Sequence, residues 1–327
     1  TTMGIAIYIA AALFLCNSLY RLIAGGYAEM LAVARTPLHL RYPIGGVVLW
    51  VFLQISTLMR WLLPSLANRI IQTAANDKAD KLIQQKPRPG GICFIGSSTF
   101  TYWQNLEVDI TQALYGSINC NNRPKNELTV FNAGFGGSCT HDILQNVEKL
   151  CMNYAPRVIV YFCGSNNLSM GLTPDSVQQG FEAFLKRLFI LHDAQQQDAD
   201  SSSSSSKKAV APRTNHRRLG QCKIHVIYLS ITTTPFFRDS NINNSYIKAL
   251  AVNKQMKRFC HESTYKNQLT FVDTTTTGNA SKDENLKFLQ DFNYYLGDHH
   301  HLNDQGHKLL AQVLAPAIRL ALAKTDQ

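Results

Sequence analysis

The sequence predicts an α/β protein with a mostly parallel β-sheet, preceded by hydrophobic helices that anchor it to a membrane. Three observations support this class. Short apolar runs alternate with amphipathic stretches from residue 91 onward. The run 158–162 is apolar throughout, as in strands buried inside a parallel sheet. Residues 4–20 contain no charged side chain. A chain of 327 residues has room for one large domain plus an appendage, or for two modest domains.

The first 66 residues hold two apolar segments. Residues 4–24 come to about the 20 residues that cross a bilayer, and a buried helix of a soluble protein is the alternative. Residues 44–66 either span the bilayer or lie along its surface. Basic residues flank both sides of the second segment, so the positive-inside rule does not orient the pair. We expect residues 1–66 to anchor the protein to a membrane, for example an organellar membrane such as the mitochondrial inner membrane.

The boundaries of the soluble domain follow from composition. Residues 67–90 are typical of a polar linker helix that ends in a breaker rich in proline and glycine. The domain is therefore expected over residues 91–323. Within it, residues 195–220 form a low-complexity insertion rich in glutamine and serine, which we expect to be flexible.

Strands and helices are expected to alternate within this domain. A further helix should contain Trp103 and Leu106, soon after the first strand. The expected strands are 92–95, 128–132, 158–162, 224–229 and 269–272, and the other expected helices are 140–152, 174–192, 246–262 and 304–323. Ligands of such sheets bind outside the carboxyl ends of the strands, so those loops are the place to look for chemistry.

Composition and motifs exclude several classes of function. The net charge of +10 is spread along the chain, which favours an anionic membrane surface or an acidic partner over nucleic acid. No Cys-x-x-Cys pair occurs, and the adjacent histidines 299–301 lack the other ligands of a metal site. Phe100 stands where an α/β-hydrolase elbow needs glycine, and no Rossmann or Walker spacing is present. No cofactor or metal is expected.

Four loops after predicted strands carry the parts that ester hydrolysis needs. A serine nucleophile requires a base, and a neutral imidazole can take its proton. Asp298 and His301 are three residues apart, so a short loop can bring carboxylate and ring together. Helix capping is the alternative role for Ser97, Ser98 or Thr99. The four blocks are Gly96–Ser98, Asn132–Ser138, Gly164–Asn167 and Gly297–Asn303.

These blocks, in this order, resemble the SGNH hydrolases, the GDSL-like esterase, lipase and acylhydrolase superfamily, in its Gly-Ser-Ser variant. The resemblance covers the chain from about residue 91 to the C-terminal helix. It implies a three-layer α/β/α flavodoxin-like sandwich around a mostly parallel five-stranded sheet. The paired N-terminal apolar segments are not part of that family's catalytic unit.

The resemblance also assigns roles to residues. It implies Ser98 as nucleophile, with His301 and Asp298 completing a triad and the cap role left to Ser97 or Thr99. It implies an oxyanion hole made by the Ser98 N–H, Gly137 and Asn166. From their positions near strand ends, rather than from the resemblance, three further residues are expected to line the substrate site: Phe135, Asn167 and Met170. Ordinary core is the alternative for Phe135 and Met170.

One departure from the family pattern concerns Asn167, which stands where the third block often has aspartate. The neighbouring donor Asn166 is retained, so only the support of the oxyanion hole is expected to change.

The sequence therefore predicts a membrane-anchored serine esterase or acylhydrolase that cleaves a carboxylic ester. The alternative is an accessory subunit of a larger membrane complex, for example a mitochondrial one, in which the triad is idle. The two readings share the bilayer as a partner.

Overall fold

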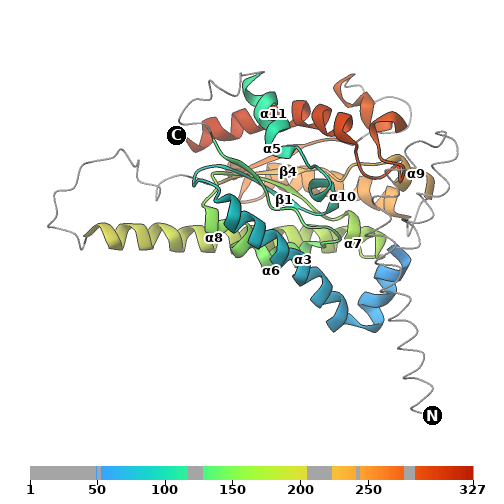
Figure 1. The fold of residues 1–327 in the computed structure, drawn as a ribbon, viewed down its shortest axis with the longest axis horizontal. Helices are drawn as coiled ribbons and strands as arrows, with labels where there is room; N and C mark the ends of the chain where they lie inside the picture. Colours follow the sequence, from blue (N-terminus) through green and yellow to red (C-terminus); the bar gives the residue numbers. More distant parts are fainter. Residues whose placement is uncertain are drawn as a thin grey trace, which may run out of the picture.

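A five-stranded parallel sheet lies at the centre of the protein (Figure 1). The computed structural model describes residues 49, 53–116, 128–204, 223–240, 244–275 and 284–326. The strand order is β2-β1-β3-β4-β5, which is the order of flavodoxin-like folds. The strands are β1 (Ile92–Gly96), β2 (Val130–Asn132), β3 (Val158–Phe162), β4 (His225–Leu229) and β5 (Leu269–Val272). The predicted α/β class with a parallel sheet is confirmed.

Helices cover both faces of the sheet, because both faces of each inner strand are apolar. Cys93 and Ile95 point into one core, and Ile92 and Phe94 point into the other. The first core is covered by α3 (Pro64–Gln85), α6 (Thr140–Leu150), α8 (Pro174–Ser204) and α10 (Ser245–Glu262). The second is covered by α5 (Leu106–Tyr115) and α11 (Asp304–Thr325). Figure 1 shows α5 and α11 on one side of the sheet and α3, α6 and α8 on the other.

Short helices lie in the connections between the strands and the longer helices. The α-helical ones are α4 (Ser98–Thr101), α7 (Ser165–Ser169) and α9 (Pro235–Ser240). The 3-10 helices are η2 (Met152–Tyr154), η5 (Lys266–Gln268), η6 (Glu284–Gln290) and η7 (Phe292–Tyr294).

The helix expected as a linker over residues 67–90 is packed against the domain. Observed as α3, it begins at Pro64 and ends before Lys86, whose φ of 50° is left-handed. Ala75 and Leu82 are fully buried in the core beside α6. The polar residues that suggested a linker lie on its exposed face.

The expected membrane segments are only partly visible. Residues 4–24 lie outside the described residues. Of the second segment, residues 53–62 form a helical stretch of about 15 Å, and α3 starts after the non-helical Leu63. Among the described residues, no helix is both long and apolar enough to cross a membrane.

The low-complexity insertion begins within a helix. α8 continues through Ser204, whereas the sequence suggested an end near residue 192. Gln195 donates from Nε2 to the carbonyl oxygen of Met152 at 3.0 Å, which fixes this part of α8 to the domain. Residues 195–204 of the expected insertion are thus the end of α8, and residues 205–222 lie outside the described part.

Candidate active site

The turn after β1 presents Ser98 at the carboxyl edge of the sheet. A Cβ at Gly96 would lie 2.2 Å from the carbonyl oxygen of Phe162, so only glycine allows β1 and β3 to approach this closely. Ser98 is the first residue of α4 and is partly exposed. Ser97 occupies the N-cap position, but its hydroxyl is buried without a hydrogen-bond partner. The expected side-chain cap by Ser97 is therefore absent.

A tight loop after η7 presents Asp298 and His301. Tyr295 and Leu302 form an isolated antiparallel bridge at its base, and Leu296 donates its N–H to the carbonyl oxygen of His301 at 2.7 Å. His299 has a φ of 53°, which turns the chain between Asp298 and His301. The carboxylate of Asp298 accepts the backbone N–H of His301 at 3.0 Å, so the loop itself holds the carboxylate in place.

Ser98, His301 and Asp298 form a continuous hydrogen-bonded relay. His301 Nε2 lies 2.8 Å from Ser98 Oγ, and His301 Nδ1 lies 2.6 Å from Asp298 Oδ2. A carboxylate can only accept, so Nδ1 carries the proton and Nε2 can accept the proton of the serine hydroxyl. The structure thus brings together three residues that are separated by up to 203 positions in the chain.

The electrostatics of the relay keep Asp298 ionised. Burial by itself raises the pKa of Asp298, but the charge of His301 and the hydrogen bonds that it donates outweigh burial and hold the pKa well below its usual range. Asp298 and His301 are 7% and 6% exposed, which excludes water from their contact. A buried carboxylate beside the ring stabilises the imidazolium that forms when Ser98 loses its proton.

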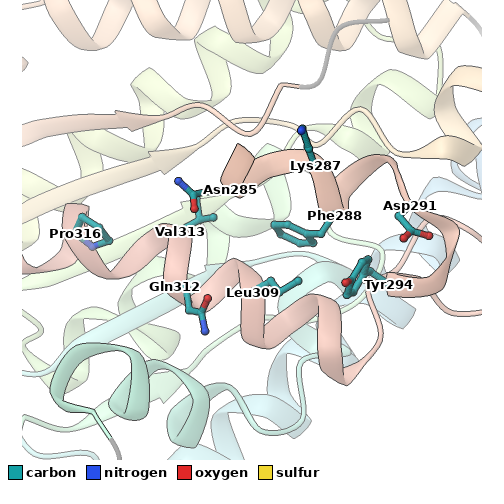
Figure 2. A pocket seen from close by; sticks show the side chains of 9 residues that line it. All are labelled: Asn285, Lys287, Phe288, Asp291, Tyr294, Leu309, Gln312, Val313 and Pro316. Carbon is teal, nitrogen blue, oxygen red and sulfur yellow. The ribbon is translucent and has the colours of Figure 1, made fainter. Parts of the chain in front are cut away.

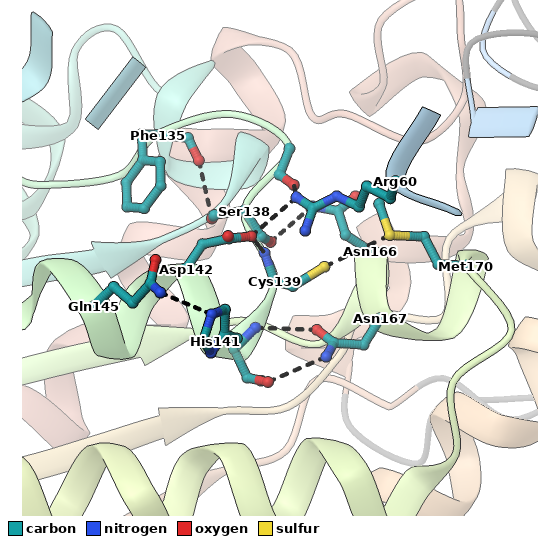
Figure 3. A network of polar contacts seen from close by, with 12 residues as sticks. Arg60, Phe135, Ser138, Cys139, His141, Asp142, Gln145, Asn166, Asn167 and Met170 are labelled. Atoms are coloured by element: carbon teal, nitrogen blue, oxygen red, sulfur yellow. Dashed lines mark hydrogen bonds and ion pairs between the residues drawn. The ribbon is translucent and has the colours of Figure 1, made fainter. Parts of the chain in front are cut away.

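Gly137 lies in the loop between β2 and α6, and this loop is held by hydrogen bonds along its length. Phe135 donates its N–H to Gly96 at 3.0 Å, and Ser138 Oγ donates to Phe135 at 3.0 Å. Gly137 has a φ of 74°, a left-handed conformation that glycine adopts without strain. Its carbonyl oxygen accepts a hydrogen bond from Arg60 Nη2 at 3.1 Å (Figure 3).

The two asparagines that follow β3 have different surroundings. Asn166 is partly exposed and donates from Nδ2 to the carbonyl oxygen of Ser138 at 2.9 Å. This bond uses one of its two N–H groups. Asn167 is buried, accepts the backbone N–H of Thr140 and donates to Thr140 Oγ1, both at 3.1 Å. Asn167 thus holds the first turn of α6, although it was expected to line the substrate site.

The remaining expected site residues, Phe135 and Met170, have different surroundings. Phe135 is 2% exposed and packs in the core beneath α6. Met170 is half-buried at the end of α7, with its sulfur 3.8 Å from the sulfur of Cys139. An open cavity of about 720 Å³ is lined by residues of η6, η7 and α11, including Phe288, Tyr294 and Leu309 (Figure 2). None of the expected site residues lines it.

Two residues near the site were not expected from the sequence. The ring of Tyr102 packs edge-on against His301, with centroids 4.4 Å apart. Its spacing of four residues from Ser98, about one helical turn, is the only signal that could have pointed to it. Arg60 contacts Gly137 across 77 positions and has no local signal.

The three adjacent histidines face different neighbours. His301 faces Ser98, whereas His300 Nδ1 lies 3.0 Å from Thr234 Oγ1. His299 packs against Phe292 with ring centroids 4.6 Å apart. Their rings therefore do not converge on a common point.

Comparison with known proteins yields structural likenesses only. No family model matches the chain, and no curated protein matches it. A Streptococcus pneumoniae structure whose description names platelet activating factor is 18% identical, with a TM-score of 0.49, over 78% of this chain and 97% of that chain. A GDSL-like lipase of Bacteroides thetaiotaomicron is 15% identical, with a TM-score of 0.45, over 77% and 98%. A variant of an acetyl-xylooligosaccharide esterase from Geobacillus is 15% identical, with a TM-score of 0.47, over 71% and 95%.

Proposed function

We propose that this protein is a serine esterase or acylhydrolase of the SGNH type that cleaves a carboxylic ester. The observation that carries the proposal is the relay from Ser98 Oγ to His301 Nε2 at 2.8 Å and from His301 Nδ1 to Asp298 Oδ2 at 2.6 Å. Its three members have the chemical types, order and separations that nucleophilic catalysis by serine requires.

In this mechanism Ser98 Oγ attacks the ester carbonyl carbon while His301 Nε2 takes the hydroxyl proton. Negative charge develops on the carbonyl oxygen, where the N–H groups of Ser98, Gly137 and Asn166 serve as donors. His301 then gives the proton to the leaving alkoxide, and an acyl group remains on Ser98. Water, activated by His301, hydrolyses that acyl-enzyme and restores the serine. Asp298 holds His301 in one tautomer throughout.

The test is covalent labelling together with hydrolysis. The purified full chain is treated with a fluorophosphonate probe and assayed on aryl esters of increasing acyl length. We expect labelling and turnover in the wild type, and loss of both in Ser98→Ala. Ser97→Ala is the matched control, because its buried hydroxyl has no hydrogen-bond partner and should leave both signals in place.

Labelling that persists in Ser98→Ala would refute the proposal. A wild type that neither reacts nor hydrolyses any ester, but stays in a stable membrane complex during purification, would favour the alternative of an accessory subunit with an idle triad.

We further propose that the enzyme is seated at a membrane through the helical stretch 53–62. Its outward side chains are apolar, with Leu58, Trp61 and Leu62 exposed by 54%, 79% and 55%. Its inward side carries Leu53 in the core and Arg60 on the domain. An apolar outer face with a cation on the inner face reverses the usual arrangement of a surface helix, and a lipid surface would accommodate it.

Co-sedimentation with anionic phospholipid vesicles tests this seating. Trp61→Ser combined with Leu62→Ser should weaken sedimentation of the full chain, since two exposed apolar side chains are removed. Ile190→Ser is the control, because Ile190 is similarly exposed on α8. Equal sedimentation of all three proteins would contradict a membrane seat at residues 53–62.

A further inference from the structure

Arg60 reaches the candidate active site from outside the alternating strands and helices. It belongs to the helical stretch 53–62, which precedes α3 in the chain. Its Nη2 atom donates to the carbonyl oxygen of Gly137 at 3.1 Å and to Asp142 Oδ2 at 2.9 Å (Figure 3). These contacts span 77 and 82 positions of the chain. A segment that sequence patterns assign to membrane anchoring therefore touches the loop that carries an oxyanion donor.

The contact restrains the backbone at Gly137, where glycine allows conformations that other residues avoid. Without a Cβ, Gly137 tolerates more than one orientation of the peptide that follows it. C-terminal to Gly137 the chain is already fixed: Asn166 Nδ2 donates to the carbonyl oxygen of Ser138, and the N–H of Cys139 donates to Asp142 Oδ2 at 2.8 Å. Arg60 supplies the corresponding restraint to the carbonyl group of Gly137 itself. It therefore limits rotation about ψ of Gly137, whose φ is 74°.

Asp142 fixes the guanidinium group in turn. Its carboxylate is 2% exposed and accepts from both Arg60 and the backbone of Cys139. The Arg60 side chain is 27% exposed, so the pair is partly shielded from water. A planar guanidinium can serve two acceptors in a set geometry, which the ammonium group of lysine does less well.

We propose that Arg60 is a positioning residue for the oxyanion hole. By holding the Gly137 carbonyl group it fixes the peptide between Gly137 and Ser138, and thereby the backbone conformation of Gly137 that directs the N–H of the preceding peptide at the developing negative charge. The inference rests on the proposed esterase function and goes beyond it, because it makes the segment before α3 a working part of the site. Arg60 donates to a backbone carbonyl group in this role and need not touch the substrate. Its removal should weaken binding of the transition state more than binding of the ester.

The experiment compares the full-length wild type with Arg60→Gln and Arg60→Lys on one soluble short-chain ester. Affinity for an alkyl boronic acid, which forms a tetrahedral anionic adduct on serine, is measured in parallel. We expect kcat to fall about 10- to 100-fold in Arg60→Gln while KM changes by less than about 2-fold. Boronate affinity should fall by a similar factor, and Arg60→Lys should lie between Arg60→Gln and the wild type.

Arg187→Gln is the matched control. Arg187 also pairs with one carboxylate, Glu148 at 3.0 Å, but on an exposed surface between α8 and α6. It should leave kcat, KM and boronate affinity unchanged. If Arg60→Gln does not fold, as judged by thermal unfolding, Arg60→Lys becomes the test variant. Its kcat and its boronate affinity, each relative to the wild type, then decide whether Arg60 is a positioning residue.

Two failures are distinguishable. If the wild type shows no hydrolysis that depends on Ser98, the proposed function itself is wrong. If the wild type is active but the folded Arg60 variants keep kcat and boronate affinity, and lose only thermal stability, Arg60 is a structural ion-pair residue and the positioning role is refuted.

Discussion

The candidate site has two halves that are held together differently: the relay, and the loop between β2 and α6 that contains Gly137, which we call the donor loop. In the relay, Ser98, His301 and Asp298 bond directly to one another through side chains. In the donor loop, Gly137 has no side chain, and its carbonyl oxygen accepts a hydrogen bond from Arg60 of a remote segment. The relay is held by hydrogen bonds between the side chains of its own members. The donors depend on a backbone conformation that other parts of the fold impose.

This difference separates two kinds of damage. Substitutions in the relay remove proton transfer, whereas substitutions around the donors weaken electrostatic stabilisation and leave proton transfer in place. The first kind should be larger, and the second should be graded by how directly a residue acts on the developing charge.

The largest effect should follow from changing the relay by one atom. Asp298→Asn replaces a carboxylate that only accepts with an amide that can donate, which favours the wrong tautomer of His301. We expect kcat to fall by about 10⁴-fold with little change in folding, measured by ester turnover and thermal unfolding. Asp304→Asn, an exposed carboxylate six positions later, should have no effect. Retention of a tenth of the activity in Asp298→Asn would show that the relay is not the working base.

The neighbouring asparagines should divide catalysis from stability. Asn166→Ala removes a donor and should lower kcat by about 10²- to 10³-fold. Asn167→Ala removes two hydrogen bonds to Thr140 and should instead lower the free energy of unfolding by about 1–3 kcal/mol. Both quantities are measured for both variants, by steady-state kinetics and urea unfolding. The reverse pattern would place the oxyanion donor at Asn167.

Two adjacent glycines sharpen the statement that the donor loop depends on backbone conformation. Gly137→Ala places a Cβ on a residue with a φ of 74°, which costs about 1–2 kcal/mol, although the nearest atom is an ordinary 3.4 Å away. We expect a lower melting temperature and a kcat reduced about 10-fold. At Gly136 a Cβ would meet nothing within 4 Å, so Gly136→Ala is the control. Equal tolerance at both positions would mean that the left-handed conformation is not needed.

The smallest effect concerns a buried histidine beneath the relay. Burial, and secondarily the charge of His301, lower the pKa of His307 to about 3. An unfolded histidine titrates near 6.5, so below that pH the unfolded chain binds a proton that the folded chain does not. Stability should therefore fall with acidification, by about 1.4 kcal/mol per pH unit between about pH 6.5 and 3 for this group.

Urea unfolding at pH 7.5 and 5.5 measures this loss. His307→Phe keeps an aromatic ring stacked on Trp103, whose ring lies 5.0 Å away, but cannot titrate. It should lose about 1 kcal/mol less than the wild type over this interval. An identical loss in both proteins would assign the acid sensitivity to other groups.

Much of the scaffold could be predicted because its signals are local. The apolar run Val158–Phe162 is a strand as expected, and the strand at 269–272 has the expected bounds. Helix ends were less accurate, because a polar composition does not mark where a helix stops: α8 runs to Ser204, beyond the expected end at residue 192. The linker expectation for 67–90 was incomplete because a single buried stripe with Ala75 and Leu82 suffices to dock α3.

Sequence alone determined which chemical groups follow which strand. A serine follows the first strand, glycine and asparagine follow the next two, and an aspartate stands three residues before a histidine. These features can be recognised from spacing along the chain, because residues a few positions apart in one loop lie close together. Only the tertiary structure decided that Arg60 binds Gly137, that Asn167 serves Thr140, and that the Ser97 hydroxyl has no partner. Such contacts depend on how elements that are distant in the sequence pack together, which spacing along the chain does not predict.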